Sequence, residues 1–131
     1  MIGFGENNEE FGNISPALIS CEEISNEEGF AKNSLKIKIS TWTGITIQII
    51  FPSYIMHLTR NESYTAWDDY EIRKGTYLVA FSKSRFIDFY DDAIVHTEDY
   101  SWPGRGKHFG VYTDSHLIDV IADSKPIITR L

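Results

Sequence analysis

The chain has 131 residues, of which 42% are hydrophobic and 24% are charged, and its formal net charge is −7. This composition is typical of one globular domain, because it is too polar for a membrane protein and too rich in apolar residues for a disordered chain. The first 31 residues hold seven glutamates and no Lys or Arg, whereas residues 32–131 hold twelve acidic and twelve basic residues. This acidic asymmetry suggests a protein partner, and a pI near 5.0 without a basic stripe argues against direct binding of nucleic acid.

We expect no targeting signal in this sequence. The start of the chain has no basic region and no apolar run of signal-peptide length, and no later segment approaches the roughly 20 apolar residues that span a bilayer. We therefore expect a cytoplasmic protein that does not enter a membrane. Cys21 has no second cysteine to pair with, which fits a reducing compartment. The carboxylates of Glu22 and Glu23 raise the pKa of a neighbouring thiol, so we expect Cys21 to be structural and not a nucleophile.

The first half of the chain predicts a loop followed by strands. Residues 1–16 hold three glycines and Pro16, which predicts a loop or a mobile acidic N-terminal segment ahead of a single domain over residues 17–131. Residues 18–24 fit a short edge strand. Residues 34–40 and 45–51 alternate strictly between apolar and polar side chains, and Thr43-Gly44 separates the two runs. They predict a β-hairpin with one buried face, which Pro52 ends because it cannot donate to a ladder.

The middle of the chain predicts a buried strand and the main helix. Residues 53–60 fit either one or two helical turns or a further strand. The apolar run 76–81 lies between Gly75 and Ser82, as expected of a central strand buried on both faces. Residues 84–95 predict a helix that Ser82 or Ser84 caps, with aspartates opposite its apolar positions. Those apolar positions are Phe86, Ile87, Phe89, Tyr90 and Ile94.

The last third predicts a polar loop and a second hairpin. Residues 96–107 form the loop, residues 108–113 and 116–122 the two strands, and a short apolar tail follows Pro126. Together these elements predict an α+β fold. It is a single domain with a mostly antiparallel sheet of two hairpins plus a central strand, and with one main helix, at about residues 84–95, packed on one face.

An acidic and aromatic segment is the first candidate site. Aromatic side chains supply large contact areas at low entropic cost, and carboxylates beside them match a basic protein surface. We expect a partner-binding surface there; the alternative is that Trp67 and one tyrosine only anchor a loop to the core. The candidate partner-binding residues are Tyr64, Trp67, Asp68, Asp69, Tyr70 and Glu71, with Trp102 from the loop at 96–107.

The histidines are the second candidate site. His96 and Glu98 are two residues apart and would point the same way on a strand, and His108 could join them. The spacing lacks the three or four converging ligands that zinc needs, so we expect neither a metal nor a cofactor. The glycine-rich loop around Arg105 could be an anion cradle, but it lacks the strand before and helix after that such cradles require. A solvated loop is the better interpretation.

Three stretches of the chain resemble a known class of protein. They are residues 81–89 (FSKSRFIDF), residues 107–112 (KHFGVY) and residues 116–121 (HLIDVI). Within about residues 64–121 the chain resembles small bacterial immunity proteins, the partners of secreted or contact-delivered toxins. The resemblance implies a cytosolic protein that binds and blocks one toxin, often a nuclease. It supplies no functional residue and no particular fold, since immunity proteins differ widely in fold.

Two main hypotheses about function follow. The first is an acidic binding protein of the immunity type, which occludes a basic toxin such as a nuclease and carries out no reaction itself. The alternative is a small enzyme or a metal- or ligand-binding protein that uses His96, His108, His116 and Asp119, with Arg105 near an aromatic pocket. A subunit of a larger assembly would share the surface expected under the first hypothesis. The sequence favours binding over catalysis.

Overall fold

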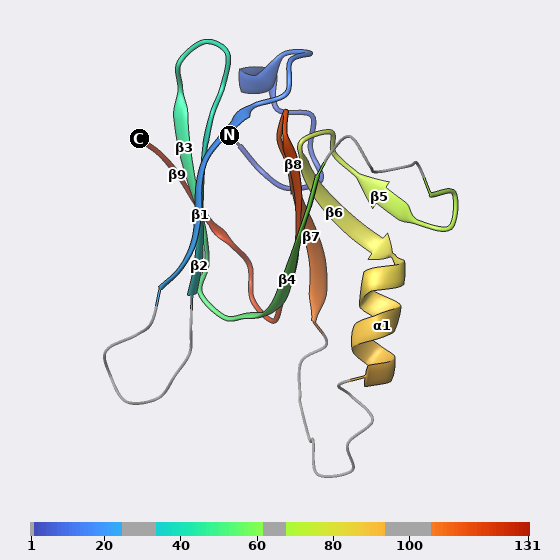
Figure 1. Cartoon of the computed structure of the whole chain (residues 1–131). Helices are drawn as coiled ribbons and strands as arrows, with labels where there is room; N and C mark the ends of the chain where they lie inside the picture. The colour runs from blue at the N-terminus through green and yellow to red at the C-terminus, as the bar shows by residue number, and fades with distance from the viewer. Residues whose placement is uncertain (1, 25–33, 62–67, 94–105) are drawn as a thin grey trace.

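The computed structural model describes residues 2–24, 34–61, 68–93 and 106–131, which form two antiparallel sheets and one α-helix (Figure 1). The first sheet has the strand order β1 (Ala17–Ile24), β2 (Ser34–Ser40), β3 (Thr46–Phe51) and β9 (Ile127–Arg130). The second has the order β4 (Tyr54–Asn61), β8 (His116–Ala122), β7 (Lys107–Tyr112), β6 (Leu78–Lys83) and β5 (Ile72–Lys74). A 3₁₀ turn, η1 (Glu9–Phe11), precedes the strands, and helix α1 (Arg85–Ala93) follows β6. The predicted α+β class is confirmed.

Both predicted hairpins are present. Leu35 in β2 lies opposite Phe51 in β3, and His108 in β7 lies opposite Ile121 in β8. Residues 53–60 fitted either helical turns or a further strand, and the structure has a strand there, β4 over Tyr54–Asn61. The chain changes sheets between β3 and β4, where Pro52 and Ser53 turn it, because proline cannot continue a ladder.

Two features differ from the sequence-based expectations. The tail after Pro126 was expected only as a short apolar end, yet it forms β9 and pairs with β3, so both sides of the first hairpin are covered by other strands. Strand β6, expected at the centre, lies next to the edge strand β5, and β7 takes the middle position of the second sheet. Leu78 and Val79 of β6 are nevertheless buried on its two faces. Pairing between distant segments decided strand order, which local patterns do not encode.

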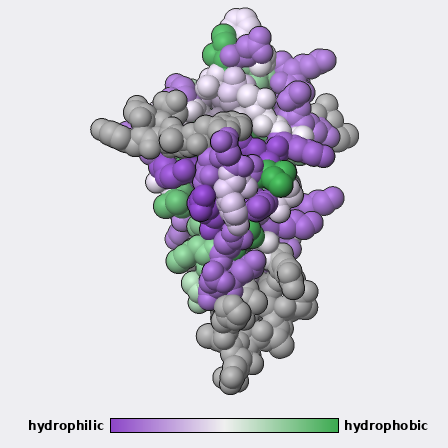
Figure 2. Space-filling model, turned by 90° about the vertical axis from the view of Figure 1, so that its right-hand side faces the viewer, coloured by the Kyte–Doolittle hydropathy of each residue, from purple (hydrophilic) through white to green (hydrophobic). Residues whose placement is uncertain are grey.

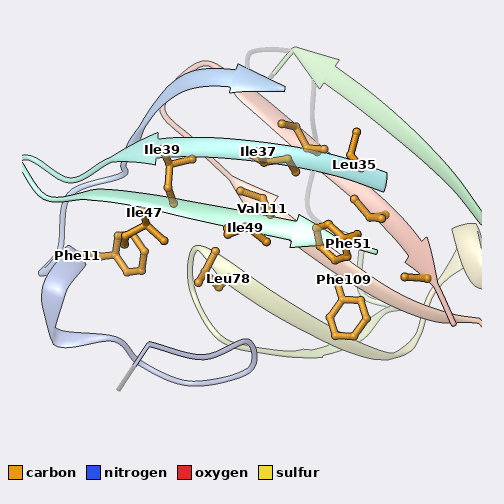
Figure 3. Packing of buried hydrophobic residues seen from close by; sticks show 13 residues of the cluster. Phe11, Leu35, Ile37, Ile39, Ile47, Ile49, Phe51, Leu78, Phe109 and Val111 are labelled. Carbon is orange, nitrogen blue, oxygen red and sulfur yellow. The ribbon is translucent and has the colours of Figure 1, made fainter. Parts of the chain in front are cut away.

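The core lies between the two sheets (Figure 3). Alternation in β2 and β3 directs one row of side chains from each strand inward, where they meet residues of the second sheet. Phe51 and Phe109 come from different sheets and pack with ring centroids 5.8 Å apart. The buried residues from the first sheet are Leu35, Ile37, Ile39, Ile47, Ile49 and Phe51, and those from the second include Leu78, Phe109, Val111, Ile118 and Val120.

The N-terminal segment packs against this core. Phe11, at the end of η1, is buried in it, and Phe4 contacts both Phe51 and Phe109 edge to face. The amide of Gly5 donates to the carbonyl oxygen of Leu78 at 2.9 Å. Apart from η1, residues 2–16 form neither helix nor strand. The acidic segment is therefore part of the domain's packing at the end where η1 lies.

Helix α1 lies on the outer face of the second sheet, the face that points away from the first sheet (Figure 1). Of the two serines expected as caps, Ser84 caps the helix, because its Oγ accepts the amide hydrogen of Ile87 at 3.1 Å. Tyr90 is fully buried, whereas Phe89, expected on the apolar side, is 55% exposed. The view onto the side of β5 and α1 is mostly hydrophilic with separate hydrophobic spots (Figure 2). Among the described residues, no helix has the length and apolar character to cross a membrane.

Candidate functional site

A polar network is buried on the outer face of the second sheet. Val111 and Val120 point into the core, so the alternation of β7 and β8 directs His108, Tyr112 and Asp119 to the opposite face. There Phe86 of α1 and Phe81 of β6 pack against His108, and Phe81 also contacts the Tyr112 ring. His108 is 3% exposed, Asp119 is 2% exposed, and Ser84 at the start of α1 has no exposed surface. Such burial requires each polar group to have partners.

The partners form a continuous chain of hydrogen bonds. The Ser84 Oγ lies 2.7 Å from Nδ1 of His108, and Nε2 of His108 lies 2.7 Å from Oδ1 of Asp119. The hydroxyl of Tyr112 donates to the same Oδ1 at 3.2 Å. Nη2 of Arg60, in the edge strand β4, donates to Oδ2 of Asp119 at 2.9 Å. The network therefore joins α1 to β7, β8 and β4.

Aromatic rings enclose the His108 imidazole. The Phe81 ring stacks on it with centroids 3.8 Å apart and an angle of 4° between planes. The Phe86 ring of α1 meets it edge on at 5.3 Å. These contacts hold the imidazole plane in one orientation, with its two nitrogens directed at Ser84 and Asp119.

The residue types match those of a nucleophilic triad, but the arrangement differs from one. A triad serine must reach its substrate, whereas the Ser84 hydroxyl is fully buried and already accepts the Ile87 amide hydrogen. The Asp119 carboxylate is likewise already hydrogen-bonded, to His108, Tyr112 and Arg60. This geometry fits a network that fastens α1 to the sheet. Of the residues proposed for catalysis, His108 and Asp119 do converge, in this buried position.

Burial and charge shift two pKa values around the network. Burial raises the pKa of the Tyr112 phenol far above its usual value, and the negative charge of Asp119 adds to that shift. Partial burial likewise raises the pKa of Glu71, which lies just before β5. The charges of His108 and Arg60 oppose that rise, whereas those of Asp68 and Asp119 add to it. Glu71 is thus electrostatically coupled to the network.

The acidic and aromatic segment, as far as it is described, packs against α1. The Asp68 carboxylate accepts a hydrogen bond from Nε of Arg85 at 2.6 Å, which lowers the pKa of Asp68. The Tyr70 hydroxyl donates to Asp88, and this bond raises the pKa of Tyr70. The ammonium of Lys83 lies 4.2 Å from the centre of the Tyr70 ring. The segment and the helix therefore make one continuous surface.

We call this surface the acidic helix face. Its members are acidic or aromatic residues of α1 and of the turn before β5, and both Lys83 and Arg85 at its border are engaged by Tyr70 or Asp68. Phe89 is its exposed aromatic residue. The acidic helix face consists of Asp68, Asp69, Tyr70, Asp88, Phe89, Asp91 and Asp92.

Other predicted site residues lie elsewhere. Tyr64, Trp67, His96, Trp102 and Arg105 fall outside the described residues. His116 lies at the start of β8, where its Nδ1 is 2.8 Å from the Ser115 hydroxyl. The described part of the chain contains no group of three or more His, Cys, Asp or Glu side chains that could hold a metal ion.

Sequence reasoning missed three members of the buried network. Ser84 was expected only as a cap, and neither Arg60 nor Tyr112 was singled out. The alternation of residues 108–112 and 116–122 does direct His108, Tyr112 and Asp119 to one face once the hairpin register is known. Arg60 could not be found in this way, because it joins through the pairing of β4 with β8, which are far apart in the sequence.

The chain was compared with protein-family models, with curated proteins and with solved structures, and none of the three comparisons returned a match.

Proposed function

We propose that the protein is an acidic binding protein of the immunity type, which occludes a basic toxin such as a nuclease domain. The observation that carries the proposal is the acidic helix face, where Phe89 is 55% exposed on a helix that also carries Asp88, Asp91 and Asp92. An exposed aromatic residue costs free energy in water and gains it when a partner covers the ring. Aromatic residues, phenylalanine among them, are enriched in protein–protein interfaces.

The charge of the face supports a basic partner. It holds five aspartates, and the two cations at its border are already engaged within the molecule, Arg85 with Asp68 and Lys83 with the Tyr70 ring. Because aspartates outnumber these two cations, the net negative charge of the face would attract an Arg- or Lys-rich surface and speed its association, with a rate that falls as salt rises. The groove of a nuclease, which normally holds the phosphates of its substrate, has the complementary positive charge.

Rigidity of the face supports tight docking. Asp68 and Tyr70 are tied to α1, and α1 is tied to the sheet by Ser84, so little ordering is needed when a partner binds. Inhibition then needs no chemistry, because a protein seated over a catalytic groove excludes the substrate.

The test combines capture with matched variants. The tagged protein is incubated with cell extract, and the proteins that it retains are identified by mass spectrometry. The retained partner is then purified and assayed for nuclease or other toxic activity, with and without the protein described here. We expect one stoichiometric basic partner whose activity is blocked. In the variant Asp69→Lys/Phe89→Ala/Asp91→Lys, we expect binding weakened by at least about 2 kcal/mol, the scale of interface hot spots.

The matched control reverses charges on other surfaces. Asp114→Lys/Asp123→Lys changes two exposed aspartates that do not belong to the acidic helix face, and this variant should bind the partner like the unmodified protein. Equal weakening in both variants would show that the interaction follows net charge alone. Unchanged binding in the correctly folded triple variant would remove the acidic helix face from the interface.

A further inference from the structure

A polar pocket of about 330 Å³ opens between the N-terminal segment and the residues that lead into β6. It lies at the end of the molecule where η1 and the turn between β2 and β3 are found, whereas α1 extends toward the other end (Figure 1). The pocket is therefore separate from the acidic helix face. The polar side chains that line it are Glu6, Asn7, Asn8, Asn13, Thr76 and Tyr77.

The walls of the pocket are fixed by contacts behind them. The Asn8 side chain accepts a hydrogen bond from the Gly3 amide at 2.9 Å and donates to the Gly3 carbonyl at 3.0 Å. Phe11 is buried in the core and meets the Tyr77 ring edge to face at 5.6 Å. The pocket is thus largely preformed, which reduces the entropy lost when a ligand binds.

An exposed tryptophan stands beside the pocket. Trp42 is 63% exposed, and its Nε1 lies 3.4 Å from where a Cβ on the pocket residue Gly12 would be. The turn that carries Trp42 is rigid, because the Thr41 amide donates to the Ile45 carbonyl at 2.8 Å and the Gly44 amide to the Thr41 carbonyl at 2.9 Å. The exposed Trp42 ring is thereby held beside Gly12, one of the residues that line the pocket.

The chemistry of the lining selects a class of ligand. Asparagine amides each offer donors and an acceptor, as a hydroxyl does, so they complement a molecule that carries many hydroxyl groups. Glu6 is the one charged residue among those that line the pocket, and its carboxylate disfavours anions. Aromatic surface at Tyr77 and Trp42 fits the apolar C–H face of a sugar ring.

We propose that this pocket binds a neutral saccharide, with Trp42 as the stacking surface and the amides of Asn7 and Asn13 as hydrogen-bonding groups. The pocket is near the lower end of the range of about 300–1,000 Å³ for small-molecule sites, so it accommodates a short saccharide of one or two rings. This proposal does not depend on the proposed protein partner, because the two surfaces share no residue.

The test is an NMR titration of the full chain, labelled with ¹⁵N, against three probes: maltose, cellobiose and N,N′-diacetylchitobiose. We expect at least one probe to produce saturable shifts at the backbone amides of Asn7, Asn13 and Tyr77 and at the indole N–H of Trp42. Trp42→Ala should weaken that binding roughly tenfold or more, about 1.4 kcal/mol, whereas Trp42→Phe should keep most of it.

Phe89→Ala is the matched control, because it removes another exposed aromatic ring on a different surface. It should leave saccharide binding unchanged. The proposal is overturned if none of the three saccharides produces saturable shifts at the pocket, or if Trp42→Ala binds as well as the unmodified protein. Spermidine serves as a cationic probe, and shifts at the pocket with spermidine alone would instead assign it to amines through Glu6.

Discussion

The imidazole of His108 and the carboxylate of Asp119 face each other at 2.7 Å inside the protein, and each is almost fully buried. Two charged or polar groups removed from water in this way stabilise the fold only while both are present, because either one alone would be left without its partner. The pair also fixes which way the imidazole points, and so connects Ser84 and α1 to β8.

Asp119→Ala should lower the free energy of unfolding by about 3–5 kcal/mol, the scale for breaking a buried ion pair. The substitution leaves His108, Tyr112 and Arg60 without the acceptor that they share. Urea unfolding followed by circular dichroism measures the change. The control Asp114→Ala, at an exposed aspartate, should shift stability by less than about 0.5 kcal/mol. Similar values for the two variants would contradict a stabilising role for the network.

Ser84→Ala should destabilise the protein by about 1–3 kcal/mol, since it removes a helix cap and a buried hydrogen bond to His108. Hydrogen exchange should show faster opening of α1 in this variant than in the unmodified protein. Ser84→Thr is the matched variant, because it keeps the hydroxyl group. Ser124→Ala, at an exposed position, is expected to be neutral. Unchanged exchange of the Ile87 amide in Ser84→Ala would mean that Ser84 does not cap α1.

Glu71→Gln should make the protein more stable at neutral pH and leave its stability at acidic pH little changed. The pKa of Glu71 is raised in the folded protein, mainly by burial, so the folded state holds this proton more tightly than the unfolded state does. Its contribution to stability is therefore present below the unfolded pKa of about 4.3 and is lost as pH rises through the folded pKa. The free energy of unfolding of Glu71→Gln and of the unmodified protein is measured from acidic to neutral pH. Parallel plots of this free energy against pH would contradict the burial of the Glu71 carboxyl group.

Cys21 should react with iodoacetamide more slowly than a free cysteine at the same pH. Burial raises the pKa of its thiol, and the charges of Glu23 and Glu22 add to the rise, so the reactive thiolate is scarce. Glu22→Gln should increase the rate, whereas Glu10→Gln, in η1, should not. Mass spectrometry over time follows the reaction. A raised thiol pKa agrees with the structural role that the sequence predicted for Cys21. If Cys21 reacted as fast as free cysteine, that result would contradict a raised pKa.

The sequence by itself determined the local elements of this protein. Strict alternation in residues 34–40 and 45–51 requires one buried face on each strand, so the first hairpin and its inward residues could be predicted. Ser84 and the helix after it were found in the same way, from a capping residue and a 3.6-residue period. These signals depend only on neighbours in the chain.

The tertiary structure alone decided the strand order and the candidate sites. The pairing of β3 with β9 and of β4 with β8 depends on how the two sheets cover each other's apolar faces, and no short segment carries that information. Phe89 had the period of a buried residue, yet Tyr90 occupies the interior and Phe89 remains exposed. The sequence offered His108 and Asp119 as candidate residues of an enzyme or ligand site, and long-range packing buried both, with His108 against Phe81 and Ser84. A site made of side chains from several strands can be recognised only in the folded protein, because the distances between those side chains are set by contacts between residues far apart in the chain.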